Sequence, residues 1–154
     1  MTDSTIAVER VERVTEEIVD SFSRLLPMLS STAIVLSREQ LEDIVRSECL
    51  LIARDRARGT IVGSLTLVMF RIPTGLRAWI EDVVVDSAVQ GRGIGETLTR
   101  EAVAIAQRAG AKTIDLTSRR SRAAAHRLYE KVGFSIRDTS VYRYAPTLVR
   151  GTES

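Results

Sequence analysis

Cysteine and histidine are almost absent from this sequence. Among 154 residues there is one cysteine, Cys49, and one histidine, His126. A single cysteine excludes an internal disulfide and is typical of proteins from a reducing compartment. Two such residues are also too few for an ordinary metal site. We therefore expect no metal cofactor, and we expect Cys49 to be a small buried apolar residue.

Long apolar runs and concentrated charge are missing as well. No stretch approaches the roughly 20 apolar residues that cross a bilayer, and the first ten residues lack the layout of a secretory signal. Lys+Arg number 22 and Asp+Glu 20, scattered along the chain, for a formal net charge of +2. No basic stripe interleaved with aromatic residues supports nucleic-acid binding. These absences predict a cytoplasmic protein that binds neither membrane nor nucleic acid.

What the sequence does contain suits one packed domain. Hydrophobic residues make up 44% of the chain, which is enough for a single core at this length. No internal repeat or long linker divides it. We expect one domain over residues 1–154, with a folded core at about 5–145 and a polar tail at 146–154.

Hydrophobic periodicity predicts the order of the elements. Strands are expected at 5–11, 49–54, 60–70, 77–85, 113–117, 134–137 and 140–144, and helices at 15–29, 37–46, 95–109 and 121–132. Thr15 and Ser37 are the expected N-caps, the latter with Gln40 at capping-box spacing. Turns join antiparallel strands up to residue 85, and helix 95–109 then crosses over to a parallel strand. This order predicts an α/β fold with a single mixed, mostly antiparallel sheet of about seven strands and helices on both faces.

The segment VVVDSAVQGRGIG, residues 83–95, passes from a strand into a helix through three glycines. Gly91, Gly93 and Gly95 allow another group to approach the backbone closely. They precede a helix, where unpaired N–H groups and the positive dipole end favour an anion. A phosphate-bearing ligand is the physical inference, and a turn that merely joins strand to helix is the alternative. The spacing does not fit the G-x-G-x-x-G fingerprint, and no lysine follows as in a nucleotide P-loop.

Two motifs in this sequence resemble those of a known family. Gln90-Gly91-Arg92-Gly93-Ile94-Gly95 resembles the Q/R-x-x-G-x-G/A signature of the GCN5-related N-acetyltransferases (GNAT family). AAAHRLYEKVGF, residues 123–134, resembles the second signature of that family, A-x-x-L-Y-x-x-x-G-F. The likeness extends from about Trp79 to Tyr144 and is only topological for residues 5–70. It implies the GNAT fold.

The resemblance implies acetyl-CoA as cosubstrate. Backbone groups of Val83 and Val85 would pair with the pantetheine arm like an added strand. A bulge would splay the fourth strand from the fifth and leave a notch for the thioester. Where many relatives carry Asn, this chain has Arg122, which either reaches a CoA phosphate or is simply solvated. The N–H groups of one short segment would hold the pyrophosphate: Gln90, Gly91, Arg92, Gly93, Ile94 and Gly95.

The resemblance also implies an acid for the leaving thiolate. Direct attack of an amine on the thioester passes through a tetrahedral intermediate, and the departing sulfur needs a proton. The second motif places Tyr129 near that sulfur, and a phenol with a pKa of about 10 keeps its proton at neutral pH. A plain core role for Tyr129 is the alternative. We expect His126 to lie on a solvent-exposed face of helix 121–132 and to have no catalytic role.

Two adjacent carboxylates are the candidates for the base. Glu81 is favoured, acting through water, and Asp82 is the substitute. Neighbouring strand residues face opposite sides, so we expect Glu81 to share a face with Val83 and Val85. Asp82 would then share the other face with residues 80 and 84. Ionic contacts at the strand's edge are the alternative role for both carboxylates.

The acceptor is the part of the reaction that the sequence specifies least. Arg71 and Arg77 flank a predicted hairpin tip, where they would attract an anionic substrate or act as ordinary surface charges. Trp79 and Phe70 are candidates to line the acceptor cleft. The run IEDVVV, residues 80–85, resembles that of the glucosamine-6-phosphate N-acetyltransferases, which points to an aminosugar phosphate, while a peptide amine stays open.

The function predicted from the sequence is N-acetyl transfer to a primary amine of a small molecule or peptide. The sequence leaves the oligomeric state open, and the resemblance adds a homodimer as one option, because related proteins are often dimers. A sensor that binds acetyl-CoA without catalysis and a regulatory protein that binds another phosphate ligand are the alternatives.

Overall fold

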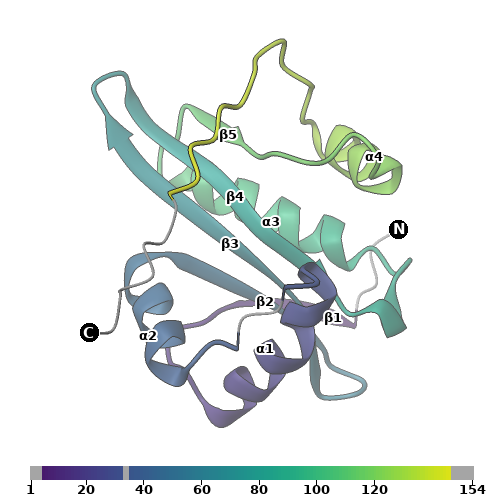
Figure 1. Ribbon diagram of the computed structural model, residues 1–154. Helices are drawn as coiled ribbons and strands as arrows, with labels where there is room; N and C mark the ends of the chain where they lie inside the picture. The colour runs from purple at the N-terminus through teal and green to yellow at the C-terminus, as the bar shows by residue number, and fades with distance from the viewer. Residues whose placement is uncertain (1–4, 33–34, 147–154) are drawn as a thin grey trace, which may run out of the picture.

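The computed structural model describes residues 5–32 and 35–146 (Figure 1). Five strands form one mixed sheet in the order β1-β2-β3-β4-β5. The first four are antiparallel to their neighbours, and β5 runs parallel to β4. The strands are β1 (Ile6–Arg10), β2 (Cys49–Asp55), β3 (Thr60–Ile72), β4 (Gly75–Val85) and β5 (Thr113–Asp115). The helices are α1 (Glu16–Leu29), α2 (Arg38–Ser47), α3 (Ile94–Arg108) and α4 (Ala123–Val132), with a short 3-10 helix η1 (Ser87–Val89). The predicted α/β class with one mixed sheet is confirmed.

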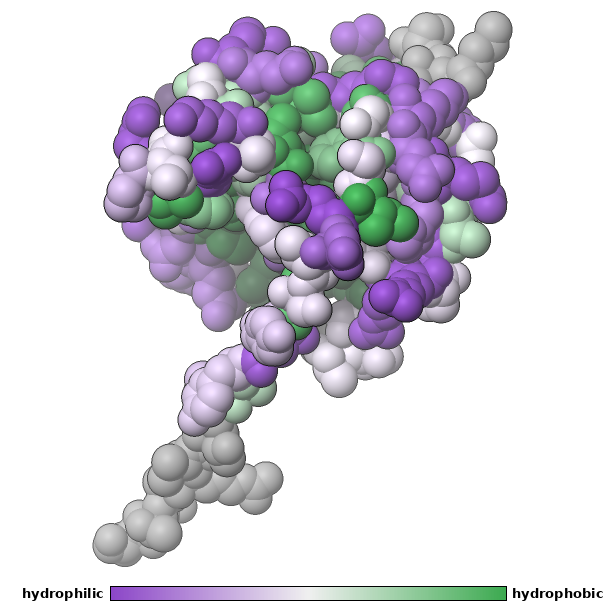
Figure 2. Space-filling model, turned by 90° about the horizontal axis from the view of Figure 1, so that it is seen from above, coloured by the Kyte–Doolittle hydropathy of each residue, from purple (hydrophilic) through white to green (hydrophobic). Residues whose placement is uncertain are grey.

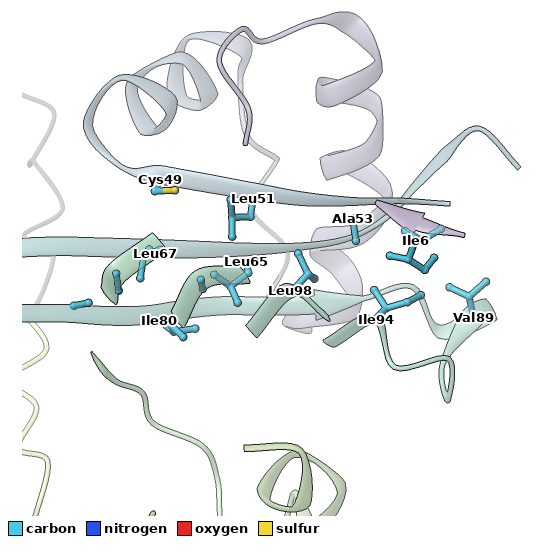
Figure 3. Packing of buried hydrophobic residues seen from close by; sticks show 14 residues of the cluster. Ile6, Cys49, Leu51, Ala53, Leu65, Leu67, Ile80, Val89, Ile94 and Leu98 are labelled. Carbon is cyan, nitrogen blue, oxygen red and sulfur yellow. The ribbon is translucent and has the colours of Figure 1, made fainter. Parts of the chain in front are cut away.

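Helices cover both faces of the sheet and divide the core in two (Figure 1). We call the face covered by α3 the α3 face and the face covered by α1 and α2 the α1 face. In Figure 3, Leu51 and Leu65 of the sheet share a buried layer with Leu98 of α3. Cys49 is buried in the same layer, as predicted. The core of the α1 face consists of Val11, Val14, Ile18, Phe22, Leu25, Leu41, Leu50, Ile52, Ile61 and Val84.

The first two helices begin at the caps that the sequence indicates. The Ile18 N–H donates to Thr15 Oγ1 at 3.3 Å. Ser37 and Gln40 form a full capping box, in which the Gln40 N–H donates to Ser37 Oγ at 3.2 Å and the Ser37 N–H to Gln40 Oε1 at 2.9 Å. These caps satisfy N–H groups that a helix cannot pair internally.

The last two predicted strands do not form, so the expectation of about seven strands is wrong. Residues 134–137 and 140–144 belong to no strand, and every residue from 135 to 146 is exposed. Alternating side chains show only that a segment suits a strand, because a strand also needs a neighbouring edge with which to pair. The predicted polar tail lies outside the described residues from position 147 onward. No helix in the described ranges is long and apolar enough to cross a membrane.

Candidate functional site

A β-bulge interrupts β4 at the predicted carboxylates. Between the pairs Ser64–Val84 and Thr66–Glu81, β4 contains one residue more than β3. Asp82 lies in this bulge with a φ of 50°, and among the described residues it alone has a positive φ without being glycine. Aspartate tolerates this left-handed conformation better than most residues. A bulge twists its strand and redirects the side chains that follow.

The bulge changes which side chains share a face, and the predicted alternation is wrong at this point. Ile80 packs in the core of the α3 face, whereas Val84 packs in the core of the α1 face. Val83 and Val85 pack on the α3 face with Ile80. Glu81 follows Ile80 directly and therefore lies on the α1 face, away from the side chains of Val83 and Val85.

β4 and β5 separate halfway along β4. Arg77–Trp79 pairs with Thr113–Asp115, and Ile80–Val85 has no partner in β5. We call the space beside this second half of β4 the notch. In Figure 1, β5 lies beside the beginning of β4 only. An open strand edge presents peptide groups that an extended ligand can pair with.

The end of β4 is fixed before the chain turns into α3. The Arg24 guanidinium of α1 donates to an Asp86 carboxylate oxygen and to the backbone oxygen of Ile61. Asp86 also accepts from the Ala88 N–H at 2.9 Å and so begins η1. Val89 is buried in the α3 face. These contacts fix the position at which residues 90–95 leave the sheet.

Residues 90–95, which we call the glycine turn, adopt a backbone conformation that requires glycine. Gly91 and Gly93 have φ values of 85° and 75°. Gly93 precedes α3 without a side-chain cap, and the first N–H groups of a helix have no acceptor within it. A Cβ at Gly91 would meet no atom within 4 Å. The turn is therefore open to the outside at the positive end of α3, where an anion is favoured.

The side chain of Arg92 anchors the glycine turn instead of facing its open side. Its guanidinium donates to Asp55 Oδ2 at 2.7 Å and to Thr5 Oγ1 at 3.0 Å. Asp55 is 1% exposed, and its Oδ1 accepts from the N–H groups of Ala57 and Arg58. The hydrogen bond from Arg92 lowers the pKa of Asp55, against the opposing effect of burial. The sequence alone indicates that Asp55 lies at a turn, but no local signal indicates that Arg92, 37 positions away, is its partner.

We expect Asp55→Asn to lower the Tm well below that of wild type, because the substitution breaks the ion pair between the buried carboxylate of Asp55 and the half-buried guanidinium of Arg92. The matched control is Asp43→Asn, since the Asp43–Arg46 pair at 2.8 Å is exposed to solvent and should contribute little. The folded-state pKa of Asp55 is lowered, so its stabilisation is present above the unfolded pKa of about 3.9 and is lost as the pH falls through the folded value. Thermal unfolding at pH 7 and pH 3 should show the Asp55→Asn deficit shrinking in acid. Equal losses in the two variants at pH 7 would contradict the anchor.

Tyr129 is half-buried where α4 ends. Its ring meets that of Phe134 edge-on, with centroids 6.0 Å apart. Gly133 ends the helix with a φ of 117°, and the Phe134 N–H donates to the Tyr129 carbonyl at 2.9 Å. Burial raises the pKa of Tyr129, with a smaller opposing effect from the charge of Arg122. The phenol therefore stays protonated throughout the neutral range.

An ion-pair cluster that the sequence analysis missed holds α4 against α3. Glu96, in the first turn of α3 and 8% exposed, accepts from Lys131 Nζ at 3.1 Å and Arg100 Nε at 3.0 Å. Hydrogen bonds from Lys131 and then Arg100 lower the pKa of Glu96. Beside it, a Cβ at Gly95 would lie 3.0 Å from Leu128 Cδ1. This close approach sets the distance between the Tyr129 helix and the glycine turn.

The two candidate bases are both exposed. Trp79 Nε1 donates to Glu81 Oε1 at 2.7 Å, which orients one carboxylate oxygen. Neither Glu81 nor Asp82 forms an ion pair within the described part of the chain, so the ionic-contact alternative has no support. Glu81 lies on the α1 face, whereas Tyr129 belongs to a helix packed on α3. The structure thus places the two groups on either side of β4.

The loop between β5 and α4 holds the remaining candidates. His126 lies 2.9 Å, through Nε2, from the carbonyl oxygen of Arg119, so it has a local structural contact. Arg122 is exposed at the start of α4, and its carbonyl accepts from the His126 N–H. Ser118 Oγ is buried and finds no hydrogen-bond partner in the described chain. A buried hydroxyl in that state suits a polar ligand group, and no local sequence signal distinguishes Ser118.

The predicted acceptor residues lie along the β3–β4 hairpin. Phe70, 41% exposed, pairs across the strands with Arg77. Arg77 donates to Thr113 Oγ1 at 3.2 Å and to Thr74 Oγ1 at 3.0 Å, so its guanidinium stiffens the hairpin. Arg71 is exposed. Among the described residues, no group of three or more His, Cys, Asp or Glu side chains is arranged to hold a metal.

Comparison with known proteins adds independent evidence. The sequence model of the acetyltransferase (GNAT) family matches residues 11–134. A Trypanosoma brucei acetyltransferase is 25% identical with a TM-score of 0.72, over 91% of this chain and 99% of that one. Glucosamine-6-phosphate N-acetyltransferase from Arabidopsis thaliana is 20% identical, with a TM-score of 0.72, over 92% of this chain and 99% of that one.

A third solved structure is an aminoglycoside acetyltransferase from an uncultured soil metagenomic sample, in complex with trehalose. It is 19% identical with a TM-score of 0.75, over 94% of this chain and 98% of that one. At these low identities the last two likenesses show the fold alone. None of the curated proteins matches this chain. The match of the family model over most of the sequence shows that the chain belongs to the acetyltransferase (GNAT) family, whose activity is acetyl transfer.

Proposed function

We propose that this protein is an N-acetyltransferase that moves acetyl from acetyl-CoA to a primary amine of a small molecule or peptide. One observation carries the proposal: the open glycine turn follows the unpaired half of β4, with only Asp86 and η1 between them. This arrangement combines an anion site with a slot for an extended arm, which is the shape of a diphosphate joined to pantetheine.

Each part of the cofactor has a partner in this proposal. Backbone groups of Val83 and Val85 pair with the amides of the pantetheine arm. The N–H groups of residues 90–95 donate to the pyrophosphate. Arg92 contributes only its N–H, because its side chain is bound to Asp55. The buried hydroxyl of Ser118 is a further proposed donor for the arm, and the exposed Arg122 is the proposed contact of a CoA phosphate.

The reaction needs a base for the amine proton, an acid for the departing sulfur and a hydrogen-bond donor for the oxyanion. The neutral amine attacks the thioester carbon, its N–H proton passes through water to Glu81, and the tetrahedral intermediate expels the thiolate. Tyr129 gives its proton to the sulfur as the carbon–sulfur bond breaks. The bulge frees a peptide group near Asp82 from the regular β3 ladder, and this N–H is the proposed donor to the oxyanion.

We expect Glu81→Gln to lower kcat/KM by roughly 100-fold at pH 7, because a positioned general base typically accelerates a reaction by at least this factor. The deficit should shrink at high pH, where more of the amine is already neutral. Asp82→Asn is the matched control, because it removes the adjacent carboxylate, and its loss should be smaller. Rates measured from pH 6 to pH 10 make the comparison. Equal, near-wild-type activity in both variants would leave no base in β4.

Of the two acceptor classes in this proposal, a small-molecule amine has the more support. The structural neighbours include enzymes named for glucosamine 6-phosphate and for aminoglycosides, which are both amine-bearing sugars. The exposed ring of Phe70 and the indole of Trp79 offer an apolar surface beside Glu81. Arg71 adds a positive charge at the tip of the hairpin.

The test of this function is thiol release from acetyl-CoA on a panel of amines, combined with thermal shifts. A cofactor at about 100 times its Kd should stabilise the protein by roughly 2.7 kcal/mol. We expect stabilisation by acetyl-CoA and CoA, and thiol release with at least one amino sugar or peptide. Stabilisation by CoA without thiol release from any amine would favour the sensor. Stabilisation by ATP alone would contradict the cofactor assignment.

A further inference from the structure

α4 carries the proposed acid, Tyr129, yet none of the residues of this helix is fully buried. The helix packs mainly on α3, above it in Figure 1. Figure 2 looks down on this side of the molecule and shows hydrophilic residues over most of its surface. The apolar contacts here are Leu128 over Gly95 and Phe134 at the edge of the α3-face core. Burial of an apolar face usually fixes a helix, so the position of α4 depends more than usual on its polar contacts with α3.

Glu96 makes the main polar contact between the two helices and uses both of its carboxylate oxygens. Oε2 accepts from Lys131 Nζ of α4 at 3.1 Å, and Oε1 accepts from Arg100 Nε within α3 at 3.0 Å. The Glu96 side chain is 11% exposed and that of Lys131 is 56% exposed. Exclusion of water from one partner strengthens the attraction between two opposite charges. The pair with Lys131 therefore holds α4 in a defined place on α3.

The same contact connects the glycine turn to Tyr129. Glu96 directly follows the last residue of the glycine turn, and its partner Lys131 lies two residues after Tyr129 on the same helix. The geometry of a helix fixes the relative positions of its residues. With Lys131 held on Glu96 and Leu128 held on Gly95, the direction of the Tyr129 ring relative to the glycine turn is fixed as well.

We propose that Glu96 is a positioning residue for acetyl transfer, which acts through Lys131 to set the place of the Tyr129 phenol relative to the glycine turn. This inference rests on the proposed function, in which the turn holds the diphosphate and Tyr129 protonates the departing sulfur. A reacting group that is misplaced by about 1 Å loses much of its catalytic effect. Glu96 itself is not a contact of the cofactor, because its negative charge would repel the diphosphate.

Glu96→Gln is expected to lower kcat about tenfold without raising the KM for acetyl-CoA. The substitution removes a negative charge near the proposed diphosphate site, so a direct effect on cofactor binding would lower KM. In the Tyr129→Phe background the same substitution should change kcat by less than about twofold, because the phenol through which it acts is missing. Glu101→Gln is the matched control on α3, since the Glu101–Arg108 pair at 3.5 Å is exposed, and it should keep wild-type kcat.

Lys131→Met breaks the same pair from the other helix. It leaves Glu96 with Arg100 as a partner and replaces a side chain that is mostly exposed, so this variant should fold even where Glu96→Gln does not. We expect its kcat to fall about tenfold as well. Lys131→Arg keeps the charge and the donors, and its kcat should stay within about twofold of wild type.

A titration of the phenol tests its position without any turnover. In a background with Tyr142→Phe and Tyr144→Phe, Tyr129 is the only tyrosine of the chain, so the absorbance of tyrosinate follows this phenol alone. Burial raises the pKa of Tyr129, and a displaced α4 should therefore lower that pKa in both Glu96→Gln and Lys131→Met. The loss of the Lys131 charge would by itself raise the pKa, so a fall in both variants reports movement of the phenol.

Three results would overturn the proposal. The first is a loss in Glu96→Gln that multiplies with that of Tyr129→Phe, to about 1,000-fold in the double variant, because Glu96 would then act separately. The second is wild-type kcat in both Glu96→Gln and Lys131→Met, and the third is an unchanged titration of Tyr129 in both. A protein that acetylates no amine but shows the shifted titration would contradict the proposed function and still support the placement of Tyr129 by Glu96.

Discussion

Replacing Tyr129 with phenylalanine is expected to lower kcat by roughly 100-fold or more and to leave the KM for acetyl-CoA nearly unchanged. The substitution removes one oxygen and keeps the ring that packs against Phe134. The thiolate must then leave without its proton donor, while the cofactor contacts of the glycine turn remain. Because burial raises the pKa of Tyr129, the phenol remains a proton donor well into the alkaline range.

The control for this substitution is Tyr144→Phe, which removes a phenol that is 89% exposed and keeps the ring. Steady-state rates with acetyl-CoA and an amine from the active part of the panel give both constants. We expect wild-type kcat from Tyr144→Phe. Wild-type turnover in Tyr129→Phe would remove the acid from the mechanism, and a purely structural role would appear as a lower Tm.

Gly91→Ala is expected to weaken CoA binding at least tenfold, which corresponds to about 1.4 kcal/mol. A methyl group there would enter the open space outside the glycine turn, where the pyrophosphate is proposed to lie. Gly110, just beyond α3, provides a closely matched control. Both glycines have a φ of 85° and no atom within 4 Å of an added Cβ. The backbone strain of the two alanine variants should therefore be similar, at roughly 1–2 kcal/mol each.

Calorimetric titration with CoA distinguishes strain from a lost binding site. We expect both alanine variants to lose a similar amount of Tm, and only Gly91→Ala to lose affinity. If the two variants bind CoA equally well, the space outside Gly91 does not hold the cofactor. If both lose affinity equally, the effect comes from general strain in α3.

The sequence analysis predicts best those elements whose determinants are local. The Thr15 cap and the Ser37–Gln40 capping box lie within a few residues of the helices that they begin, and the structure has them as predicted. The glycine turn is also local, because positive φ values at Gly91 and Gly93 follow from the residues themselves. The separation of β4 from β5, expected from the family resemblance, is present as well.

Features that depend on distant partners are not predictable in this way. The alternation around Glu81 is wrong because the bulge arises from pairing with β3, which no short motif encodes. The last two strands are predicted from alternation alone, yet the structure pairs neither segment with a strand of the sheet. The Arg92–Asp55 anchor and the Glu96–Lys131 contact join residues 37 and 35 positions apart, and each residue alone looks like an ordinary surface charge.

The sequence therefore predicts which residues form the candidate site better than it predicts how those residues are arranged. The structure places the glycine turn after the notch, and Glu96 holds the helix of Tyr129 close to that turn. It separates Glu81 from the side chains of Val83 and Val85, and places it beside Trp79 on the α1 face, where we propose that the acceptor binds. The proposed acid and the proposed base thus lie on either side of β4, which suits a reaction in which cofactor and amine approach the same strand from different directions.

A crystal structure with coenzyme A bound tests the central claim most directly. We predict diphosphate oxygens within about 2.7–3.2 Å of backbone nitrogens in residues 90–95, with the pantetheine arm beside the second half of β4. The Arg92 side chain should remain on Asp55. A diphosphate bound at another place, with the glycine turn unoccupied and the edge of β4 still open, would contradict the account.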